Sequence, residues 1–204
     1  MIHMWGQRFM RGFVVSWVIL FCMATASVAG PALDAAKKSM NEVLAVLKDP
    51  SLRGEAGKKA KKEKIKAVSG QMFDLPELSK RTLAQNWNRL TPDQRTEFMD
   101  LYRSLLEDAY VDKIASYTDE KVLFLKEVSL SENTIEVQSI VYRKGGDVPV
   151  NYRMINRGGQ WKVYDVVIEG VSLVNNYRAQ FREILGNQTP EALLEILRKK
   201  VSKR

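Results

Sequence analysis

Hydrophobic positions follow two spacings along this chain. They recur every three to four residues up to about residue 117 and every second residue from 121 to 169. The first spacing is that of a helix with one buried face, and the second is that of a strand. The pattern therefore predicts helices over 31–117, a sheet over 121–169 and C-terminal helices over 172–202. This order is typical of an α+β fold.

Two of the expected helices begin with capping sequences. Asp74 is followed three residues later by Glu77, and the segment from Thr91 to Gln94 repeats the arrangement with a proline at the first helical position. Such pairs satisfy the free N–H groups of a first helical turn. We therefore expect helices to begin at both places, the second carrying an apolar stripe as far as Tyr117.

Four strands are predicted, and they are joined by turns too short for a crossover. They are Lys121–Val128, Thr134–Arg143, Val148–Asn156 and Gln160–Ile168. Such short turns force antiparallel neighbours, so the product is a meander. Both faces of the last two strands are apolar, and a sheet of this kind needs cover on both faces or a bound guest. We expect the sheet to curl and to enclose an apolar cavity with the helices.

The first residues have the pattern of an export signal. Arg8 and Arg11 precede an apolar run from Phe13 to Met23, and Ser27 to Ala29 form a small-x-small cleavage site. The apolar run is about eleven residues, whereas a membrane-spanning helix needs roughly twenty. Cleavage of residues 1–29 is therefore favoured over a retained anchor.

Loss of this segment removes His3 and Cys22, the only histidine and the only cysteine in the sequence. The remaining chain has no imidazole or thiol for Ser-His-Asp or Cys-His catalysis, for the usual zinc or copper ligand sets, or for a disulfide. Residues 30–204 are enough for a single domain with one proper core.

The chain is moderately basic, with a net charge of +8, or +6 without Arg8 and Arg11. An exported protein of this charge meets anionic lipid or acidic proteins more readily than DNA. Six lysines crowd into residues 58–66. We interpret this run as a solvated helix face, and the alternative is a patch that meets phosphate head groups or an acidic partner.

Several short strings along the chain resemble one protein family. They are Phe73-Asp74, Leu78-Ser79, Trp87, Leu90-Thr91-Pro92, Gln94-Arg95, Glu97-Phe98, Trp161 to Asp165, Glu169 to Leu173, Asn176 to Arg178 and Gln180-Phe181. On these strings, which span nearly the whole chain after the signal, the sequence resembles the MlaC family. These are the periplasmic phospholipid-binding proteins of the Mla pathway, also called toluene-tolerance proteins.

The resemblance implies a periplasmic shuttle. Such a protein carries phospholipid between an outer-membrane lipoprotein complex and an inner-membrane ABC transporter, maintaining outer-membrane lipid asymmetry, with transient membrane contact. The implied fold is an NTF2-like curved sheet of about four strands with about six helices, and the acyl chains enter the cavity between them. No catalysis and no cofactor are expected, since the phospholipid is cargo. A hopanoid-associated branch of the family leaves the exact lipid open.

Thirteen residues are candidates for the lipid-binding cavity lining. They are Leu101, Leu105, Tyr110, Ile114 and Tyr117 from the long helix, Val150, Tyr152, Met154, Val163 and Val167 from the strands, and Val171, Leu173 and Val174 at the strand-to-helix corner. The helix residues are equally well interpreted as ordinary core. Alternation places Val163 and Val167 on one face of their strand, but it does not tell which face lines the cavity.

Two other functional classes are open at this point. Cone-shaped folds host isomerases that use a buried carboxylate with a tyrosine donor, and Asp165, Glu169 and Tyr164 or Tyr142 could supply these groups. An interaction module would instead use the lysine run and the basic tail. The simpler interpretations are that Glu169-Gly170 is a turn whose carboxylate favours the next helix N-terminus, and that Asp165 is a surface or edge residue.

Overall fold

The computed structural model describes residues 30–117 and 120–202, so the expected signal, 1–29, lies outside the described residues. Within that part of the chain, four helices precede the sheet and two follow it. The helices are α1 Pro31–Lys48, α2 Gly54–Met72, α3 Leu75–Leu83, α4 Pro92–Ala115, α5 Leu173–Asn187 and α6 Pro190–Ser202, with short 3-10 helices η1 Pro50–Leu52 and η2 Ala84–Arg89. The predicted α+β order is confirmed.

The sheet is an antiparallel meander whose strands follow chain order. Its strands are β1 Lys121–Ser131, β2 Thr134–Tyr142, β3 Val148–Arg157, β4 Gln160–Ile168 and β5 Val171–Ser172. The first four are the predicted strands, with ends shifted by at most three residues. The fifth is only two residues long, too short for a periodic pattern to reveal it.

Both predicted helix starts are confirmed. The Asp74 carboxylate accepts a hydrogen bond from the Glu77 amide at the start of α3. At the start of α4, Thr91 and Gln94 form a reciprocal capping box. These local bonds explain why both helices begin where the sequence indicates.

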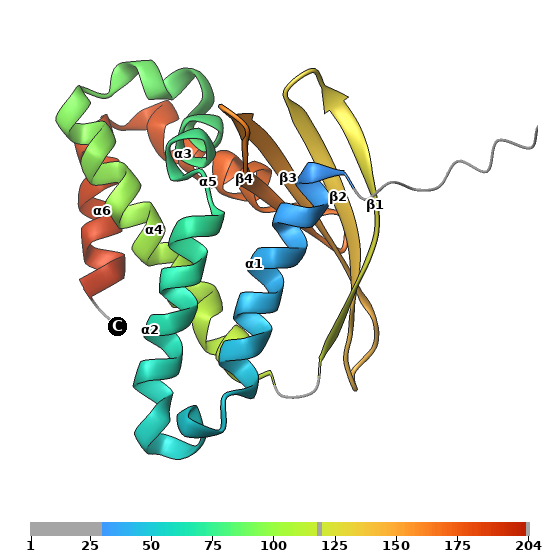
Figure 1. Ribbon diagram of the computed structural model, residues 1–204. Helices are drawn as coiled ribbons and strands as arrows, with labels where there is room; N and C mark the ends of the chain where they lie inside the picture. The colour runs from blue at the N-terminus through green and yellow to red at the C-terminus, as the bar shows by residue number, and fades with distance from the viewer. Residues whose placement is uncertain (1–29, 118–119, 203–204) are drawn as a thin grey trace, which may run out of the picture.

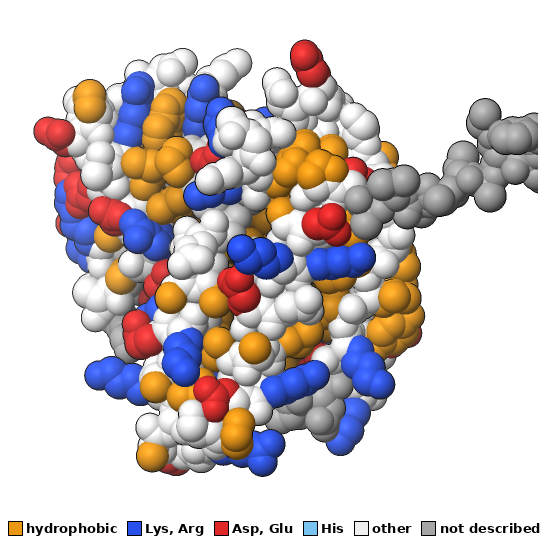
Figure 2. All heavy atoms as spheres, in the orientation of Figure 1, with side chains coloured by type: hydrophobic (Ala, Val, Ile, Leu, Met, Phe, Trp, Pro, Cys, Tyr) orange, Lys and Arg blue, Asp and Glu red, His pale blue; other side chains and the backbone are white. Residues whose placement is uncertain are grey.

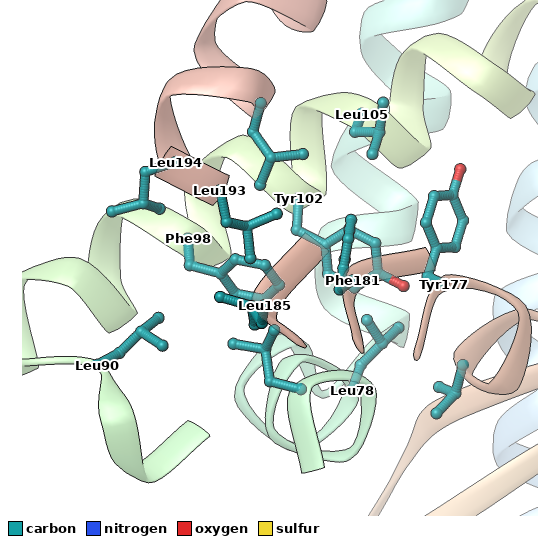
Figure 3. Packing of buried hydrophobic residues seen from close by; sticks show 13 residues of the cluster. Leu78, Leu90, Phe98, Tyr102, Leu105, Tyr177, Phe181, Leu185, Leu193 and Leu194 are labelled. Carbon is teal, nitrogen blue, oxygen red and sulfur yellow. The ribbon is translucent and has the colours of Figure 1, made fainter. Parts of the chain in front are cut away.

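The helices lie on one side of the sheet (Figure 1). Helix α1 crosses the sheet face, α2 runs beside α1, and α4 and α6 form the side of the molecule farthest from β1. The largest buried cluster, which we call the helical core, lies among α3, α4, α5 and α6 (Figure 3). The rings of Phe98, Tyr102, Tyr177 and Phe181 pack together there with centroids 5.2 to 5.7 Å apart.

An irregularity in β4 changes which side chains share a face. Met154 lies opposite Val163, but Asn151 lies opposite Val167, and the register shifts between Arg153 and Met154. The extra residue is Tyr164, and such a bulge reverses the alternation beyond it. The prediction that Val163 and Val167 share a face is therefore wrong.

The turn after β4 is a two-residue hairpin. Glu169 and Gly170 both have positive φ, 50° and 82°. This is the geometry of a type I′ turn, in which glycine is readily accommodated. The predicted turn is confirmed, but the carboxylate that favours the N-terminus of α5 belongs to Asp165 and not to the exposed Glu169.

Asp165 is buried, so its interpretation as a surface or edge residue is wrong. One carboxylate oxygen accepts the Val174 amide of α5 at 3.0 Å. The other accepts the Ser172 hydroxyl at 2.6 Å and the Arg153 guanidinium at 3.2 Å. This side chain, only 2% exposed, thus joins β3, β4 and the first turn of α5.

No helix in the described part of the chain is both long and apolar enough to cross a bilayer.

We predict that Asp165→Ala lowers the free energy of unfolding by about 2–4 kcal/mol, because three donors lose a charged acceptor. Ser172→Ala removes the cap of α5 and one of the three donors to Asp165, and should cost about 1–2 kcal/mol. Urea denaturation followed by circular dichroism measures both. Equal, small losses for the two variants would contradict a central role for the carboxylate.

Candidate functional site

A seam of apolar side chains lies between α1 and the face of the sheet that α1 covers. Its buried members are Ala32, Leu33, Ala36, Met72, Val137, Tyr152, Met154 and Val163. Ala32 and Ala36 are one helical turn apart and wholly buried. Their small side chains let the α1 backbone lie close to the sheet. Hydrophobic side chains are visible along this junction in Figure 2.

The seam continues beyond the sheet, between α1, α2 and the C-terminal half of α4. There Val43, Leu47, Ile65 and Val111 are buried, and Met40 packs against both this group and the sheet cluster. Helix α1 has 18 residues, so the seam runs for about 27 Å along it. An acyl chain spans about half of the roughly 30 Å hydrocarbon core of a bilayer. The seam is therefore long enough to accommodate one along α1.

The buried side chains of the seam carry no formal charge. Burial raises the pKa of the Tyr152 hydroxyl, while its hydrogen bond with Ser139 has a smaller opposite effect. The phenol therefore stays neutral throughout the physiological pH range. Uncharged apolar side chains of this kind favour contact with hydrocarbon, and they provide no groups that would stabilise a charged ligand.

Glu127 of β1 holds the N-terminal end of α1 at the sheet. Its carboxylate accepts the Leu33 amide at 3.0 Å, satisfying a free N–H of the first turn. The same carboxylate lies against Gly30, where a Cβ would come within 1.7 Å of an oxygen. Glycine at this position thus leaves the carboxylate room beside the helix N-terminus.

The two best-formed hollows of the described residues lie elsewhere. One is on α4, lined by residues that include Asp93, Glu97 and Asp100. The other lies between the start of α2 and the end of α4, beside Lys58 and Asp112. Both are open to solvent, and charged side chains take part in the lining of each. The expected apolar cavity is thus neither of these hollows, because the residues of the seam pack against one another. A hollow along the seam would form only if α1 and the sheet separated.

The structure divides the thirteen predicted lining residues among several places. The sheet part of the seam contains Val150, Tyr152, Met154 and Val163. The part beyond the sheet, between α1, α2 and α4, is contacted by Ile114 and Tyr117. Leu101, Leu105, Leu173 and Val174 pack in or against the helical core instead. Tyr110 is in none of the three clusters, Val167 is on the other sheet face, and Val171 is 61% exposed. Six of the thirteen are thus brought together.

The main residues that sequence reasoning left out are on α1, α2 and β2. Ala32, Leu33, Ala36, Met72 and Val137 form more than half of the buried sheet cluster. The pairing of Ala32 with Ala36 one turn apart was the available signal, because small residues at that spacing mark close helix packing.

The residues considered for an isomerase do not surround a common hollow. Asp165 already accepts three hydrogen bonds, and Glu169 is exposed. Tyr142 lies at the far end of β2, opposite Lys121. Tyr164 stacks under the Arg81 guanidinium at 4.0 Å. Their arrangement is structural and does not resemble an acid–base site.

A model of the MlaC protein family matches residues 37–199. The chain belongs to the MlaC family. The matched range contains most of α1 and all of the sheet, and hence the seam apart from Ala32, Leu33 and Ala36 at the start of α1. The family resemblance seen in the sequence is confirmed.

Two curated relatives agree with MlaC membership. An intermembrane phospholipid transport system binding protein MlaC of Haemophilus influenzae is 25% identical over 127 residues, which are 60% of this chain and 59% of that protein. The match thus spans less than two thirds of that relative. The toluene tolerance protein ttg2D of Pseudomonas putida is 24% identical over 154 residues, covering 74% of this chain and 72% of the relative.

A solved structure also shares the MlaC fold. It is a phospholipid-binding protein from Ralstonia solanacearum in complex with a phospholipid. The TM-score is 0.76 at 25% identity, with 84% of this chain and 97% of the other covered. The predicted curved-sheet α+β class is confirmed by this likeness.

We predict that Glu127→Ala loosens the N-terminal turns of α1. Loss of the carboxylate should cost about 1 kcal/mol of stability and speed hydrogen exchange of the α1 amides relative to those of the helical core. Glu132→Ala, in the exposed β1–β2 turn, is the control. Unchanged exchange in α1 would show that the carboxylate does not hold the helix.

Proposed function

We propose that this protein is a periplasmic phospholipid-binding carrier. It would take lipid between the outer membrane and an inner-membrane ABC transporter, and so maintain the lipid asymmetry of the outer membrane. The observation that most supports lipid binding is the uncharged apolar seam along α1. This seam occurs in a fold shared with a protein whose structure was solved with a bound phospholipid. Family membership and the names of the relatives support the transport role.

The energetics favour a carrier that needs help to unload. Two acyl chains contain roughly 30 methylenes, and burying each is worth about 0.8 kcal/mol. The gross gain is on the order of 20 kcal/mol, from which the cost of separating α1 from the sheet is subtracted. Release into water is therefore slow. Delivery then requires partners that open the seam, and we assign this role to the outer-membrane lipoprotein complex and the transporter.

The expected export signal supports a periplasmic location, since Arg8, Arg11 and the apolar run precede the domain. A carrier needs no catalytic group, and we propose none. A hopanoid is the alternative cargo. Both are largely apolar molecules, so the seam accepts either, and the mass of the bound lipid distinguishes them.

We predict that protein purified from its own host carries a lipid mass in native mass spectrometry and keeps it through gel filtration. Met40→Asp places a carboxylate where the two parts of the seam meet and should lower the bound fraction at least tenfold, because hydrocarbon does not solvate a charge.

The matched control is Ile184→Asp, since Ile184 is also partly buried but packs against the helical core. Its bound fraction should equal that of the unaltered protein. Equal losses in both variants would place the lipid elsewhere, and protein that never carries lipid would refute the proposed function.

A further inference from the structure

The sheet face turned away from α1 carries exposed apolar side chains near β1. Leu123 and Leu125 are each 47% exposed, and Tyr142 is 39% exposed. Leu123 pairs with Ile140, and Lys121 pairs with Tyr142, so these side chains share one face. Leu125 lies at the register shift between Phe124 and Lys126 and is exposed beside them. We call Leu123, Leu125, Ile140 and Tyr142 the β1 patch.

Basic side chains border the β1 patch. Lys121 and Lys126 lie on β1, and Arg143 and Lys144 follow β2 in its turn. All four are exposed, and no ion pair between described residues includes them. Acidic residues lie near them in sequence: Glu120 precedes Lys121, Asp147 is in the same turn as Arg143 and Lys144, and Glu127 follows Lys126 but binds α1 on the other face of the sheet.

The lysine run of α2 is different, because acidic side chains already neutralise much of it. Lys62 pairs with Asp112, Lys64 with Asp49, and Lys66 with Glu63 and Glu107. The interpretation of this run as a solvated face therefore agrees with the structure. Lys59 and Lys61 of the run form no ion pair among the described residues, but the four cations near β1 are all without one there and also lie beside exposed leucines.

Figure 2 shows these features on the surface. Hydrophobic side chains gather along the right-hand edge, over β1, and basic side chains lie below them. Strand β1 is also an edge of the sheet, with β2 as its strand neighbour. The patch is thus accessible both from its face and from its side.

We propose that the β1 patch and its four basic neighbours dock this protein on an anionic lipid bilayer. The leucines would enter the boundary between head groups and acyl chains, while the cations lie beside anionic head groups. The proposal deepens the proposed function by naming the surface that meets the membrane. It does not depend on which lipid the seam holds.

A bilayer fits this surface better than a protein does. A second copy of the chain would bring like charges together, which is unfavourable. Binding hot spots between proteins favour tryptophan, tyrosine and arginine, whereas leucine and lysine are under-represented at them. Tyr142 and Arg143 are present here, but five of the eight side chains are leucine or lysine, which are common on surfaces that rest on membranes.

The experiment is cosedimentation of the purified protein with vesicles of phosphatidylcholine, with or without about one-third phosphatidylglycerol. We expect binding to the anionic vesicles, weak binding to the neutral ones, and release at about 1 M salt, where the Debye length is about 3 Å. Absence of binding to the anionic vesicles would overturn the proposal.

Two double variants test the surface. Lys121→Ser with Lys126→Ser should weaken binding about twenty-five-fold, since each cation contributes about fivefold. Leu123→Ser with Leu125→Ser should weaken it about tenfold. Lys59→Ser with Lys61→Ser, on the α2 run, is the charge-matched control and should bind within about twofold of the unaltered protein.

Two further outcomes would overturn the docking proposal. Loss of binding only in the α2 control would place docking on the lysine run and overturn the proposal. Binding of the β1 surface to an acidic protein, with no vesicle binding, would assign it to a protein partner and overturn it as well. Native mass spectrometry of the same variants keeps the two proposals separate, because docking variants should retain their lipid.

Discussion

The packing of α1 on the sheet is the contact on which the rest of the structure depends. The sheet has an apolar inner face that must be removed from water, and α1 covers it with small side chains such as Ala32 and Ala36. Apolar packing of this kind has no preferred direction. Under the proposed function, acyl chains replace α1 against the sheet without leaving many polar groups unpaired, whereas displacing a hydrogen-bonded lid would leave them unpaired.

The helical core is held differently. Its aromatic rings interlock, and long side chains join elements far apart in sequence. Arg178 of α5 donates two hydrogen bonds to the Arg81 carbonyl of α3, and Arg89 donates to the Leu185 carbonyl of α5. Such directional bonds resist separation. The helical core is thus suited to remain one body while the seam opens.

Most of the fold could be predicted from the sequence because local signals mark its boundaries. The capping box at Thr91 and Gln94 and the turns between the first four strands are such signals. The position of Val167 could not be predicted, because the bulge at Tyr164 depends on pairing with β3. A single extra residue reverses every side chain beyond it.

The candidate site could be predicted only in part, for a related reason. Periodicity shows that Leu105 and Val174 are buried, but it does not show which interior they enter, and both belong to the helical core. The burial of Asp165 could not be predicted from the residues next to it in sequence, because its partners Arg153 and Ser172 are brought to it by the sheet and the hairpin. Which buried cluster a hydrophobic residue joins is thus decided by tertiary packing and not by the local sequence pattern.

Strand β1 links the separable seam to the outer surface. Phe124 packs against the seam, Glu127 holds α1, Leu123 lies on the outer face opposite Ile140, and Leu125 is exposed. As an edge strand with register shifts after Phe124 and after Ser129, β1 is less restrained than the strands within the sheet. A force on its outer face therefore reaches α1 through the Glu127 carboxylate and the Phe124 ring. Contact at the outer surface and the proposed opening of the seam thus act on the same strand.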